Sequence, residues 1–458
     1  MPRILKTNFT EDNWWYDGAE SVSGKVERHS MSKIGVVGLG VGYALSCALA
    51  EAGYMTVGLD INPAVIANPR RDPSIETLLA RKASGKRIER NLRLTSSYGE
   101  IADCNYAIVC VSTGDEKKLV LGHVEDAVQQ CLSVLRPSKV GSMPVVMVYS
   151  TLPFCSSKRI REIFRASGVK MNEDVGYVHF PLMIAQGTTA YDFVNPPFVI
   201  FGSDSPAVAK RAMTFYRRFI KRSLVYKGQL PPMFTGTPEE AELAKLAANA
   251  CLTAKIAVAN EIGSLGERLG VDAQKVMQVV GSDWRIGRKF TIPGYAVGGS
   301  CFPRDLKSLI ETYSETGAVP RILRAVDEAN RERLLDPLDK IEGEKVLVLG
   351  RSYKSGVPEV KGSPTMALLE VLKNRGYHVE AFDPKLDKAL PNIAPDTVIV
   401  AIAEPDFKNL GRISNRGVKV VLDYANVVDG SSLPHGTRLW QAGRGWVQSS
   451  KRKGGLEP

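Results

Sequence analysis

One cysteine of this sequence lies in a setting that suits a covalent nucleophile. The segment GGSCFPRD, residues 298–305, places Cys301 just ahead of Pro303, and proline is favoured in the first turn of a helix. A thiol at a helix N-terminus, with Arg304 nearby, would have its thiolate form stabilised. The glycines before it leave room for a substrate. We therefore expect Cys301 to react covalently, and the other six cysteines to be ordinary thiols.

A lysine and an asparagine form the second candidate group. Lys245 and Asn249 lie in an alanine-rich stretch, residues 239–270, whose apolar residues recur at helical spacing. Their i, i+4 spacing puts both side chains on one helix face. The core of a packed helix does not favour such a pair. We expect both side chains to face a site, and a solvent-facing pair is the alternative.

A glycine-rich turn follows the first predicted strand, KIGVV (33–37). Gly38, Gly40 and Gly42 would let the backbone turn tightly and approach a pyrophosphate at a helix N-terminus. The next predicted strand, 55–60, ends in Asp60. A carboxylate there can accept hydrogen bonds from both ribose hydroxyls and would repel a 2′-phosphate. The pattern predicts NAD as the cofactor in preference to NADP.

The elements that must position these residues form two α/β blocks around a helical middle. Continuous β-branched runs separated by helices predict parallel sheets covered on both faces. We expect an α/β fold: an N-terminal Rossmann domain, a central helical domain with a long helix, and a C-terminal Rossmann-like domain. The predicted strands are 33–37, 55–60, 106–111, 145–150, 177–180 and 198–202, then 345–350, 379–383, 398–403 and 420–424, with a helix near 364–375.

Composition and charge narrow the classes of protein. The 458 residues include 60 Lys+Arg and 49 Asp+Glu, a net charge of +11 that suits an anionic substrate or cofactor. Only this charge and the KRK segment of the tail would favour nucleic-acid binding, so we expect the protein not to bind nucleic acid. No apolar run approaches the ~18 residues of a spanning helix, and the N-terminus is not a secretory signal. Seven cysteines without a C-x-x-C pair indicate free thiols in a cytoplasmic protein and no metal site.

Taken together, these motifs resemble the UDP-glucose/GDP-mannose dehydrogenase family. The glycine loop with Asp60 is followed, in the family's order, by EAELAKLAANACLTAKIAVANEIGSL, GSDWRIG and GGSCFPRDLKSL. KVLVLGRSYKSGVPEVKGSPTMALLEVL is similar to the family's third domain. The resemblance implies an N-terminal extension (1–31), an NAD-binding Rossmann domain (32–230), a central helical dimerisation and catalytic domain (231–340), a C-terminal UDP-sugar-binding domain (341–447) and a tail (448–458).

The resemblance also implies a reaction. It is an NAD-linked, four-electron oxidation of a nucleotide sugar's C6 alcohol to a carboxylate, carried out by a homodimer. Cys301 would attack an aldehyde to give a thiohemiacetal and then a thioester. Lys245 and Asn249 would stabilise charge on the C6 oxygen, and Asp305 would position or activate water. UDP-glucose, an N-acetylated UDP-hexosamine and GDP-mannose stay open as substrates, with a UDP-hexose preferred.

Six further residues enter through the resemblance alone. Thr113, Thr151 and Lys361 are assigned to the cofactor, and Arg285, Gly299 and Lys354 to the nucleotide sugar.

The sequence departs from the family at two places that matter for chemistry. The glycine loop is one residue shorter than the family's G-x-G-Y-V-G. Leu182 occupies the position of a glutamate that serves acid/base or thioester chemistry, and Gln186 occupies a later acidic position. A divergent, weakly active or inactive relative that binds nucleotide sugar is therefore the alternative. A two-electron hydroxyacid dehydrogenase is a further one, although it would need neither Cys301 nor a third α/β domain.

Overall fold

The computed structural model describes residues 32–69, 73–114, 118–136, 143–224, 226, 228–414 and 417–447. The chain forms two compact units, divided on one long helix between Lys245 and Leu246. The predicted N-terminal extension and tail lie outside the described residues. Within the described ranges, no helix is both long enough and apolar enough to cross a membrane.

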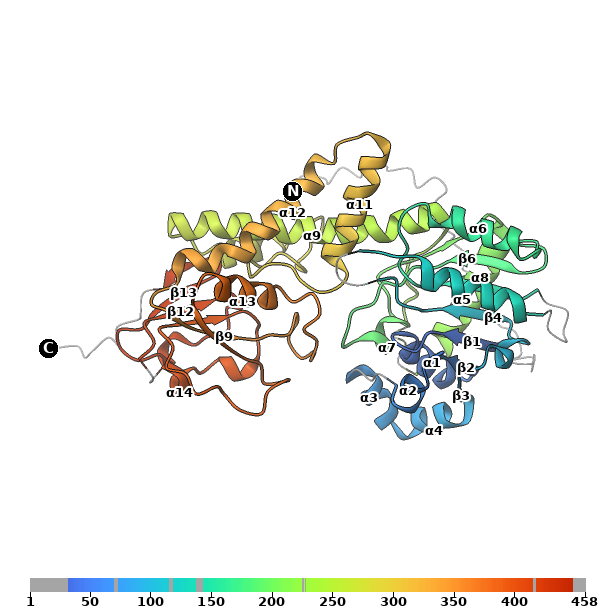
Figure 1. Ribbon diagram of the computed structural model, residues 1–458, viewed down its shortest axis with the longest axis horizontal. Helices are drawn as coiled ribbons and strands as arrows, with labels where there is room; N and C mark the ends of the chain where they lie inside the picture. The colour runs from blue at the N-terminus through green and yellow to red at the C-terminus, as the bar shows by residue number, and fades with distance from the viewer. Residues whose placement is uncertain are drawn as a thin grey trace, which may run out of the picture. The chain divides into compact units, whose positions relative to one another are not determined.

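An eight-stranded sheet forms the centre of the first unit (Figure 1). The strand order is β3-β2-β1-β4-β5-β6-β7-β8. Its first six strands have the order of a dinucleotide-binding doubly wound sheet. The strands are β1 (Lys33–Val37), β2 (Met55–Leu59), β3 (Leu92–Thr95), β4 (Tyr106–Val109), β5 (Val145–Val148), β6 (Gly176–His179), β7 (Val199–Gly202) and β8 (Met233–Gly236).

The sequence predicted a parallel sheet, and this is wrong for part of the first sheet. β7 runs antiparallel to β6, while β8 runs parallel to β7. A parallel connection needs a crossover, usually a full helix. The β6–β7 connection holds only the 4-residue helix α7 (Thr189–Asp192).

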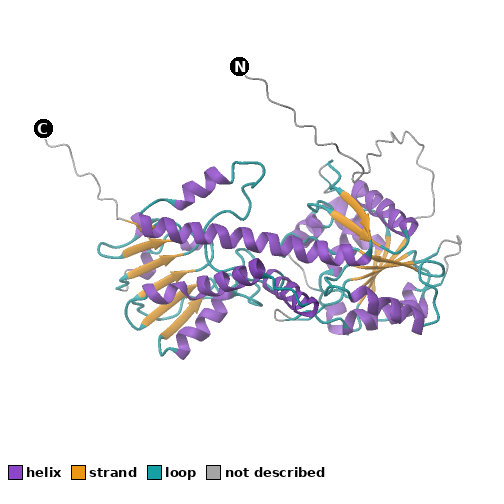
Figure 2. Cartoon of the chain, turned by 90° about the horizontal axis from the view of Figure 1, so that it is seen from above, coloured by secondary structure: helices purple, strands orange, loops and turns teal. Residues whose placement is uncertain are grey.

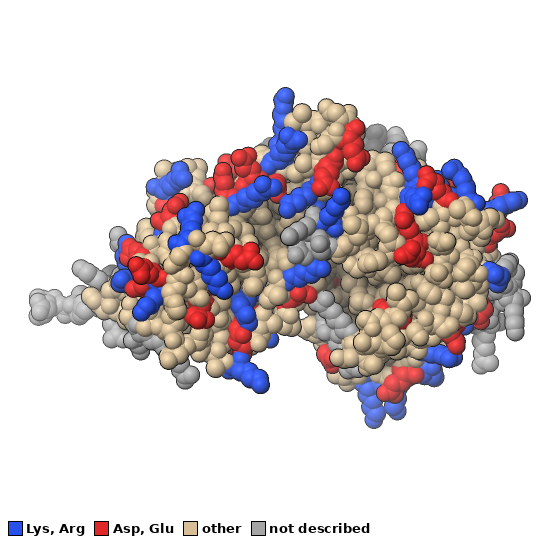
Figure 3. Space-filling model, viewed as in Figure 1, with Lys and Arg blue, Asp and Glu red and all other residues tan. Residues whose placement is uncertain are grey.

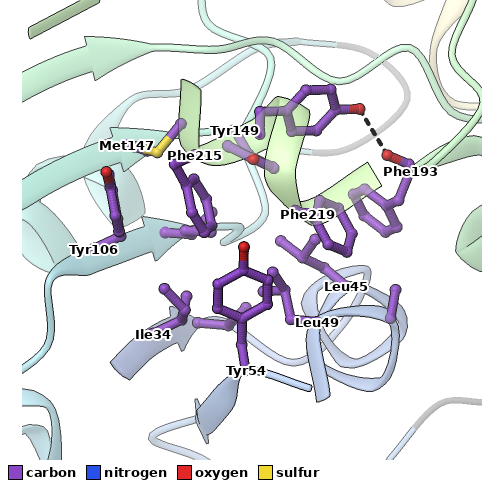
Figure 4. Packing of buried hydrophobic residues seen from close by; sticks show 14 of the residues in the cluster. Ile34, Leu45, Leu49, Tyr54, Tyr106, Met147, Tyr149, Phe193, Phe215 and Phe219 are labelled. Carbon is purple, nitrogen blue, oxygen red and sulfur yellow. Dashed lines mark hydrogen bonds between the residues drawn. The ribbon is translucent and has the colours of Figure 1, made fainter. Parts of the chain in front are cut away.

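Helices cover both faces of this sheet, and each face has its own core. Ile34 of β1 and Tyr106 of β4 belong to one buried cluster, and Val37 and Val109 of the same strands belong to the other. Figure 4 shows the first cluster, where strand residues meet helix residues such as Phe215. The helices are α1 (Gly42–Glu51), α2 (Pro63–Ala67), α3 (Pro73–Ala80), α4 (Lys82–Asn91), α5 (Gly122–Val134), α6 (Ser156–Ala166) and α8 (Pro206–Arg222), with the 3-10 helix η1 (Tyr98–Ile101).

A helical segment joins the two sheets in the sequence. Its first helix, α9 (Pro238–Leu269), has 32 residues, begins in the first unit and continues unbroken into the second; it is the long helix in Figure 2. Its buried alanines Ala241, Ala250 and Ala259 let other elements pack closely against it. The segment continues with α10 (Ala273–Val280), α11 (Phe302–Thr316), α12 (Arg321–Leu335) and the 3-10 helix η2 (Asp336–Lys340).

The second unit contains a six-stranded sheet of order β10-β9-β11-β12-β13-β14. Neighbouring strands are parallel from β10 to β13, and β14 is antiparallel to β13. The elements are β9 (Lys345–Leu349), α13 (Pro364–Asn374), β10 (His378–Phe382), β11 (Thr397–Val400), η3 (Pro405–Phe407), α14 (Gly411–Ser414), β12 (Val420–Asp423), η4 (Gly430–Ser432), β13 (Arg438–Gln441) and β14 (Gly445–Val447).

This architecture confirms the predicted fold class of two α/β blocks and a helical middle. The predicted domain boundaries at 230 and 340 stay predictions, and β8, which follows residue 230, pairs with the first sheet. On the face drawn in Figure 3, lysines and arginines are interspersed with aspartates and glutamates.

Candidate active site

The glycine loop of the first unit forms a strand–turn–helix despite its short length. Gly38 has φ +91, and a side chain there would meet Val111 at 2.9 Å. Its N–H donates to the carbonyl of Leu59 at 2.8 Å, which joins the ends of β1 and β2. Gly40 faces open space, and α1 begins at Gly42 with no side-chain cap on its N-terminus. Uncapped N–H groups beside an open glycine suit a pyrophosphate.

Asp60 lies directly beside this loop. Its Oδ2 accepts a hydrogen bond from the N–H of Leu39 at 2.8 Å, and its Oδ1 accepts one from the N–H of Asn62 at 2.9 Å. The residue is half-buried. Each carboxylate oxygen has two lone pairs, so both oxygens keep acceptor capacity for ribose hydroxyls.

Two threonines follow the next two strands of the same sheet. Thr113 comes after β4 and is buried, and Thr151 comes after β5 and is half-buried. Ser150 ties these strand ends together, because its hydroxyl donates to the carbonyl of Val111 at 2.7 Å. The sheet thus brings Gly38, Asp60, Thr113 and Thr151 to the carboxyl ends of its parallel strands, where ligands of such sheets bind.

Lys245 is buried on α9, not exposed to solvent. Its Nζ lies 3.9 Å from the Sδ of Met183, in the segment that departs from the family. Leu182, the residue in the place of the family's glutamate, is half-buried and packs against the apolar core of the first unit. Position 182 therefore contributes to packing in this chain.

Asn249, one turn further along α9, belongs to the second unit and is also buried. Its Nδ2 donates to the Oδ2 of Asp305 at 2.6 Å. The Oδ1 of Asp305 accepts from the Nε and Nη2 of Arg304 at 3.2 and 3.1 Å. Asp305 is fully buried, and a buried carboxylate is stable only when paired and hydrogen-bonded in this way. The structure therefore joins Asn249 to the neighbouring pair Arg304 and Asp305, which lies 56 residues further along the sequence.

Cys301 is the N-cap residue of α11, and Pro303 is in the first turn. The thiol is exposed, and its Sγ lies 3.7 Å from the Oγ of Ser300. The carbonyl of Cys301 accepts the N–H of Asp305 at 2.8 Å, so the cysteine and the aspartate are one helical turn apart. The site thus combines an accessible sulfur at a helix N-terminus with a buried, hydrogen-bonded group made of Asn249, Asp305 and Arg304.

Two of the residues assigned to the nucleotide sugar, Arg285 and Lys354, are exposed on loops of the second unit, whereas Gly299 is buried. Lys361, which was assigned to the cofactor, is also exposed and lies with Lys354 in the segment between β9 and α13. Gly299 contacts that segment directly, because its N–H donates to the carbonyl of Gly362 at 2.9 Å. Arg285 is exposed, and its Nη2 lies 2.6 Å from Asp283.

Two residues that sequence reasoning did not select help to hold this site. The side chain of Asn330 on α12 forms two hydrogen bonds with the backbone of Val297, at 2.7 and 3.1 Å. Glu242, one turn before Lys245, accepts hydrogen bonds from the N–H and the hydroxyl of Ser157 at the start of α6. An asparagine or glutamate among helical charges gives no signal of such a role. In the described part of the chain, no cluster of three His, Cys, Asp or Glu side chains could hold a metal ion.

Comparison with known proteins identifies the family. The NAD binding domain of the UDP-glucose/GDP-mannose dehydrogenase family matches residues 32–220, and the family's central domain matches residues 239–332. The chain belongs to the UDP-glucose/GDP-mannose dehydrogenase family. The resemblance seen in the sequence is thereby confirmed. The chain is an oxidoreductase, and its cofactor is NAD.

Family members that are named for their activities are similar to this chain over most of their length. UDP-glucose 6-dehydrogenase AglM of Haloferax volcanii is 29% identical over 380 residues, 80% of this chain and 86% of that protein. GDP-mannose 6-dehydrogenase of Pseudomonas aeruginosa is 27% identical over 372 residues, 78% and 82% of the two chains. The structure of a UDP-glucose dehydrogenase from Pyrobaculum islandicum is similar with a TM-score of 0.75 and 28% identity, covering 92% of this chain and 100% of that one.

Proposed function

We propose that this chain oxidises the C6 alcohol of a nucleotide sugar, a UDP-hexose before others, to the uronic acid through a covalent intermediate on Cys301. The observation that carries this proposal is the Asn249–Asp305 hydrogen bond one helical turn from the exposed sulfur of Cys301. A two-electron dehydrogenase needs no such nucleophile. The names of the related proteins above give UDP-glucose and GDP-mannose as their substrates, which supports this substrate class.

The first oxidation removes a hydride and a proton from the C6 alcohol and leaves an aldehyde. When bound, NAD accepts that hydride. Asp60 and the glycine loop would hold the adenosine ribose and the pyrophosphate. We assign Lys245 and Asn249 to the C6 oxygen, where a buried ammonium and a positioned amide would stabilise developing negative charge.

The second oxidation proceeds on the enzyme. The sulfur of Cys301 forms a bond to the aldehyde carbon, and the carbonyl oxygen becomes the thiohemiacetal oxygen. Loss of a proton from that oxygen and of a second hydride from that carbon, for which a second NAD would be the acceptor, gives a thioester. Water then attacks the thioester carbon, the carbon–sulfur bond breaks, and the carboxylic acid leaves the regenerated thiol.

Hydrolysis is the step for which this chain has the fewest acid/base groups. Asp305 is fully buried and already accepts three N–H groups. We therefore propose that Asp305 orients Asn249. Leu182 has no proton to transfer, and loss of one general acid/base typically lowers a rate by ~10²–10⁴-fold. We expect turnover limited by thioester hydrolysis, with a burst of NADH before a slow steady state.

The packing of Leu182 against the core also favours a second candidate, a weakly active or inactive relative that binds nucleotide sugar. The two candidates share the ligand and differ in whether acid is released. The first predicts turnover, and the second predicts binding without it.

We further propose a homodimer formed through α9 and the segment after it. Apolar side chains that face solvent in a single chain run along the second half of α9, and such patches mark association surfaces. Val258, Leu265 and Leu269 are 56%, 52% and 66% exposed. Sedimentation of the purified chain tests this, with Leu265→Glu as the variant that should give monomers.

The decisive test of the reaction counts NADH per sugar. Limiting UDP-glucose, UDP-N-acetylhexosamine or GDP-mannose is incubated with excess NAD, and the carboxylate product is measured. We expect two NADH and one uronate per sugar for one substrate of this panel. Cys301→Ser should abolish uronate formation, whereas Cys251→Ser, at another exposed cysteine, should have no effect. One NADH per sugar with an aldehyde product would contradict the covalent mechanism, and binding without NADH would favour the inactive relative.

A further inference from the structure

The loop that carries Cys301 is held at defined points on either side of the sulfur. Asn330 binds the N–H and the carbonyl of Val297 at its start. Asp305, bound to Asn249, fixes the first turn of α11 at its end. Between these points, two residues before Cys301, the N–H of Gly299 donates to the carbonyl of Gly362 at 2.9 Å. Of these three contacts, only the one between Gly299 and Gly362 involves the segment between β9 and α13.

The contact at Gly362 leaves no room for a side chain. A Cβ on Gly362 would lie 2.7 Å from the carbonyl carbon of Gly299, and one on Gly299 would lie 2.9 Å from the ring of Tyr353. A Cβ on Gly298 would lie 2.3 Å from the Cδ of Pro364. Real Cβ atoms do not approach other atoms so closely. The two loops therefore pack backbone against backbone, and a shift of one must displace the other.

The segment that presents Gly362 is itself well ordered by hydrogen bonds. The N–H of Tyr353 donates to the carbonyl of Glu359 at 2.9 Å, and the N–H of Lys361 donates to the carboxylate of Glu359 at 3.0 Å. The same segment carries the exposed lysines Lys354 and Lys361. The resemblance assigned Lys361 to the cofactor, but two lysines on one ordered loop also suit the negative charge of a nucleoside diphosphate. Movement on binding would reach Gly362 through this hydrogen-bonded segment.

We propose that Gly362 is a positioning residue that couples nucleoside diphosphate binding at the Lys354–Lys361 segment to the placement of Cys301. The coupling rests on the proposed function, because it assumes that this segment binds the nucleotide part of the substrate. It predicts that the nucleotide alone, without the sugar, changes the reactivity of the Cys301 thiol.

The test measures the rate at which iodoacetamide alkylates Cys301, by peptide mass spectrometry, with Cys251 as the internal reference. Rates are compared without ligand and with saturating UDP or GDP, which lack the sugar that would cover the thiol. Titration calorimetry gives the affinity of each nucleotide. The variant is Gly362→Ala. Its matched control is Gly376→Ala, which also has a positive φ (+85 against +70) and open space around its Cβ, and which lies outside the Lys354–Lys361 segment.

For the wild type and Gly376→Ala we expect UDP or GDP to change the Cys301 rate by at least about fivefold, as allosteric couplings usually do. For Gly362→Ala we expect a different rate without ligand and no further change when nucleotide binds. Equal rates without ligand in Gly362→Ala and wild type, or an undiminished nucleotide effect in Gly362→Ala, would overturn the proposal.

Two further arms keep the test decisive. Tyr353→Ala, which removes the ring beside Gly299 without backbone strain, replaces Gly362→Ala if that variant does not fold, and the same results are expected. If neither UDP nor GDP binds the wild type, the proposed nucleotide-sugar function fails and so does the coupling. The rates without ligand still decide whether Gly362 positions Cys301.

Discussion

The two sheets of this protein repeat one turn and use its carboxylate differently. Gly38 after β1 and Gly350 after β9 have φ +91 and +93, and each donates its N–H at 2.8 Å to the carbonyl that ends the neighbouring strand. In both turns the next N–H donates to an aspartate after that strand. Leu39 binds Asp60 at 2.8 Å, and Arg351 binds Asp383 at 2.9 Å.

The two aspartates differ in what else they bind. Asp60 is half-buried and accepts one further N–H, whereas Asp383 is buried and also accepts the N–H and hydroxyl of Ser352 and the N–H of Lys385. Burial alone would raise the pKa of Asp383, but the hydrogen bonds from Ser352, Lys385 and Arg351 outweigh it and keep that pKa below its ordinary value.

From this difference we infer that an aspartate at the end of the second strand indicates a cofactor site only when its carboxylate oxygens stay accessible. α1 begins at Gly42, directly after the first turn, and leaves Asp60 open beside a helix N-terminus. In the second sheet α13 begins only at Pro364, and Asp383 fixes the start of the long intervening segment. The same turn thus leaves an accessible aspartate in one unit, where we propose that the cofactor binds, and supports a loop in the other.

The largest effect should come from removing the charge of the structural aspartate. Asp383→Asn would turn an amide N–H₂ toward buried donors, and each unsatisfied donor costs about 1–3 kcal/mol, so we expect a loss of about 4 kcal/mol in the free energy of unfolding. Urea unfolding of the variant and of the exposed control Asp406→Asn measures it. Equal stability of the two variants would refute the structural role of Asp383.

A buried acid of the first unit sharpens the comparison because its pKa moves the other way. Burial raises the pKa of Glu242 to about 7, against hydrogen bonds from Ser157 and the backbone N–H of Cys155. The native state therefore keeps a proton that the unfolded chain loses from about pH 4.5 upward. The free energy of unfolding should fall as the pH rises from about 4.5 to about 7, by up to about 3 kcal/mol from this group, and stay level above that range.

Glu242→Gln should remove that fall. Urea unfolding at about pH 5 and about pH 8 compares the variant with the wild type, and Glu173→Gln, at an exposed glutamate, is the control. If the difference between Glu242→Gln and wild type is the same at both pH values, Glu242 is not protonated in the folded state at the lower one.

Changing Asp60, the accessible aspartate, should affect stability less but should clearly weaken NAD binding. Asp60→Ala removes acceptors for the ribose hydroxyls, and hydrogen bonds to charged groups are worth about 1.5–3 kcal/mol, so NAD should bind about 10–100-fold more weakly. The preference for NAD over NADP should narrow, as calorimetry with both cofactors would show. Asp103→Ala, at an exposed aspartate, should leave both affinities unchanged. An unchanged NAD affinity in Asp60→Ala would place the ribose elsewhere.

The smallest effect should come from a single donor to Asp383. Ser352→Ala removes the hydroxyl that lies 2.7 Å from Asp383 and should cost about 1 kcal/mol of stability. Ser355→Ala, whose hydroxyl makes an exposed hydrogen bond to a backbone carbonyl, is the matched control, and urea unfolding of both variants measures the loss. A larger loss in Ser352→Ala than in Asp383→Asn would show that the hydroxyl acts independently of the carboxylate.

The sequence predicted those parts of the fold that composition alone determines. Strands such as KIGVV and KVLVLG are buried on both sides, and their continuous apolar runs match β1 and β9. Short strands of mixed composition were missed, among them β3 (LRLT) and β14 (GWV). Such strands form because a neighbour pairs with them, and nothing in their own residues requires it.

The features of the site also include some that the sequence predicted and some that it could not. Helical spacing predicted that Lys245 and Asn249 share one helix face, and both side chains are buried, which rules out the solvent-facing alternative. The hydrogen bond from Asn249 to Asp305 joins residues 56 apart in sequence, and no local pattern predicts such a partner. The contact of Gly299 with Gly362 could not be predicted either, since a glycine required by close packing is indistinguishable in sequence from one in an open turn.

The assignment of Cys301 is tested most directly by the mass of the enzyme during turnover. Enzyme mixed with NAD and its nucleotide sugar is quenched in acid within the NADH burst, and the intact protein and its peptides are weighed. The account predicts an adduct on Cys301 equal to the nucleotide sugar less four hydrogens, the mass of the thioester, which is absent without NAD and in Cys301→Ser. Turnover to uronate with no adduct on Cys301, or with an adduct on another residue, would contradict it.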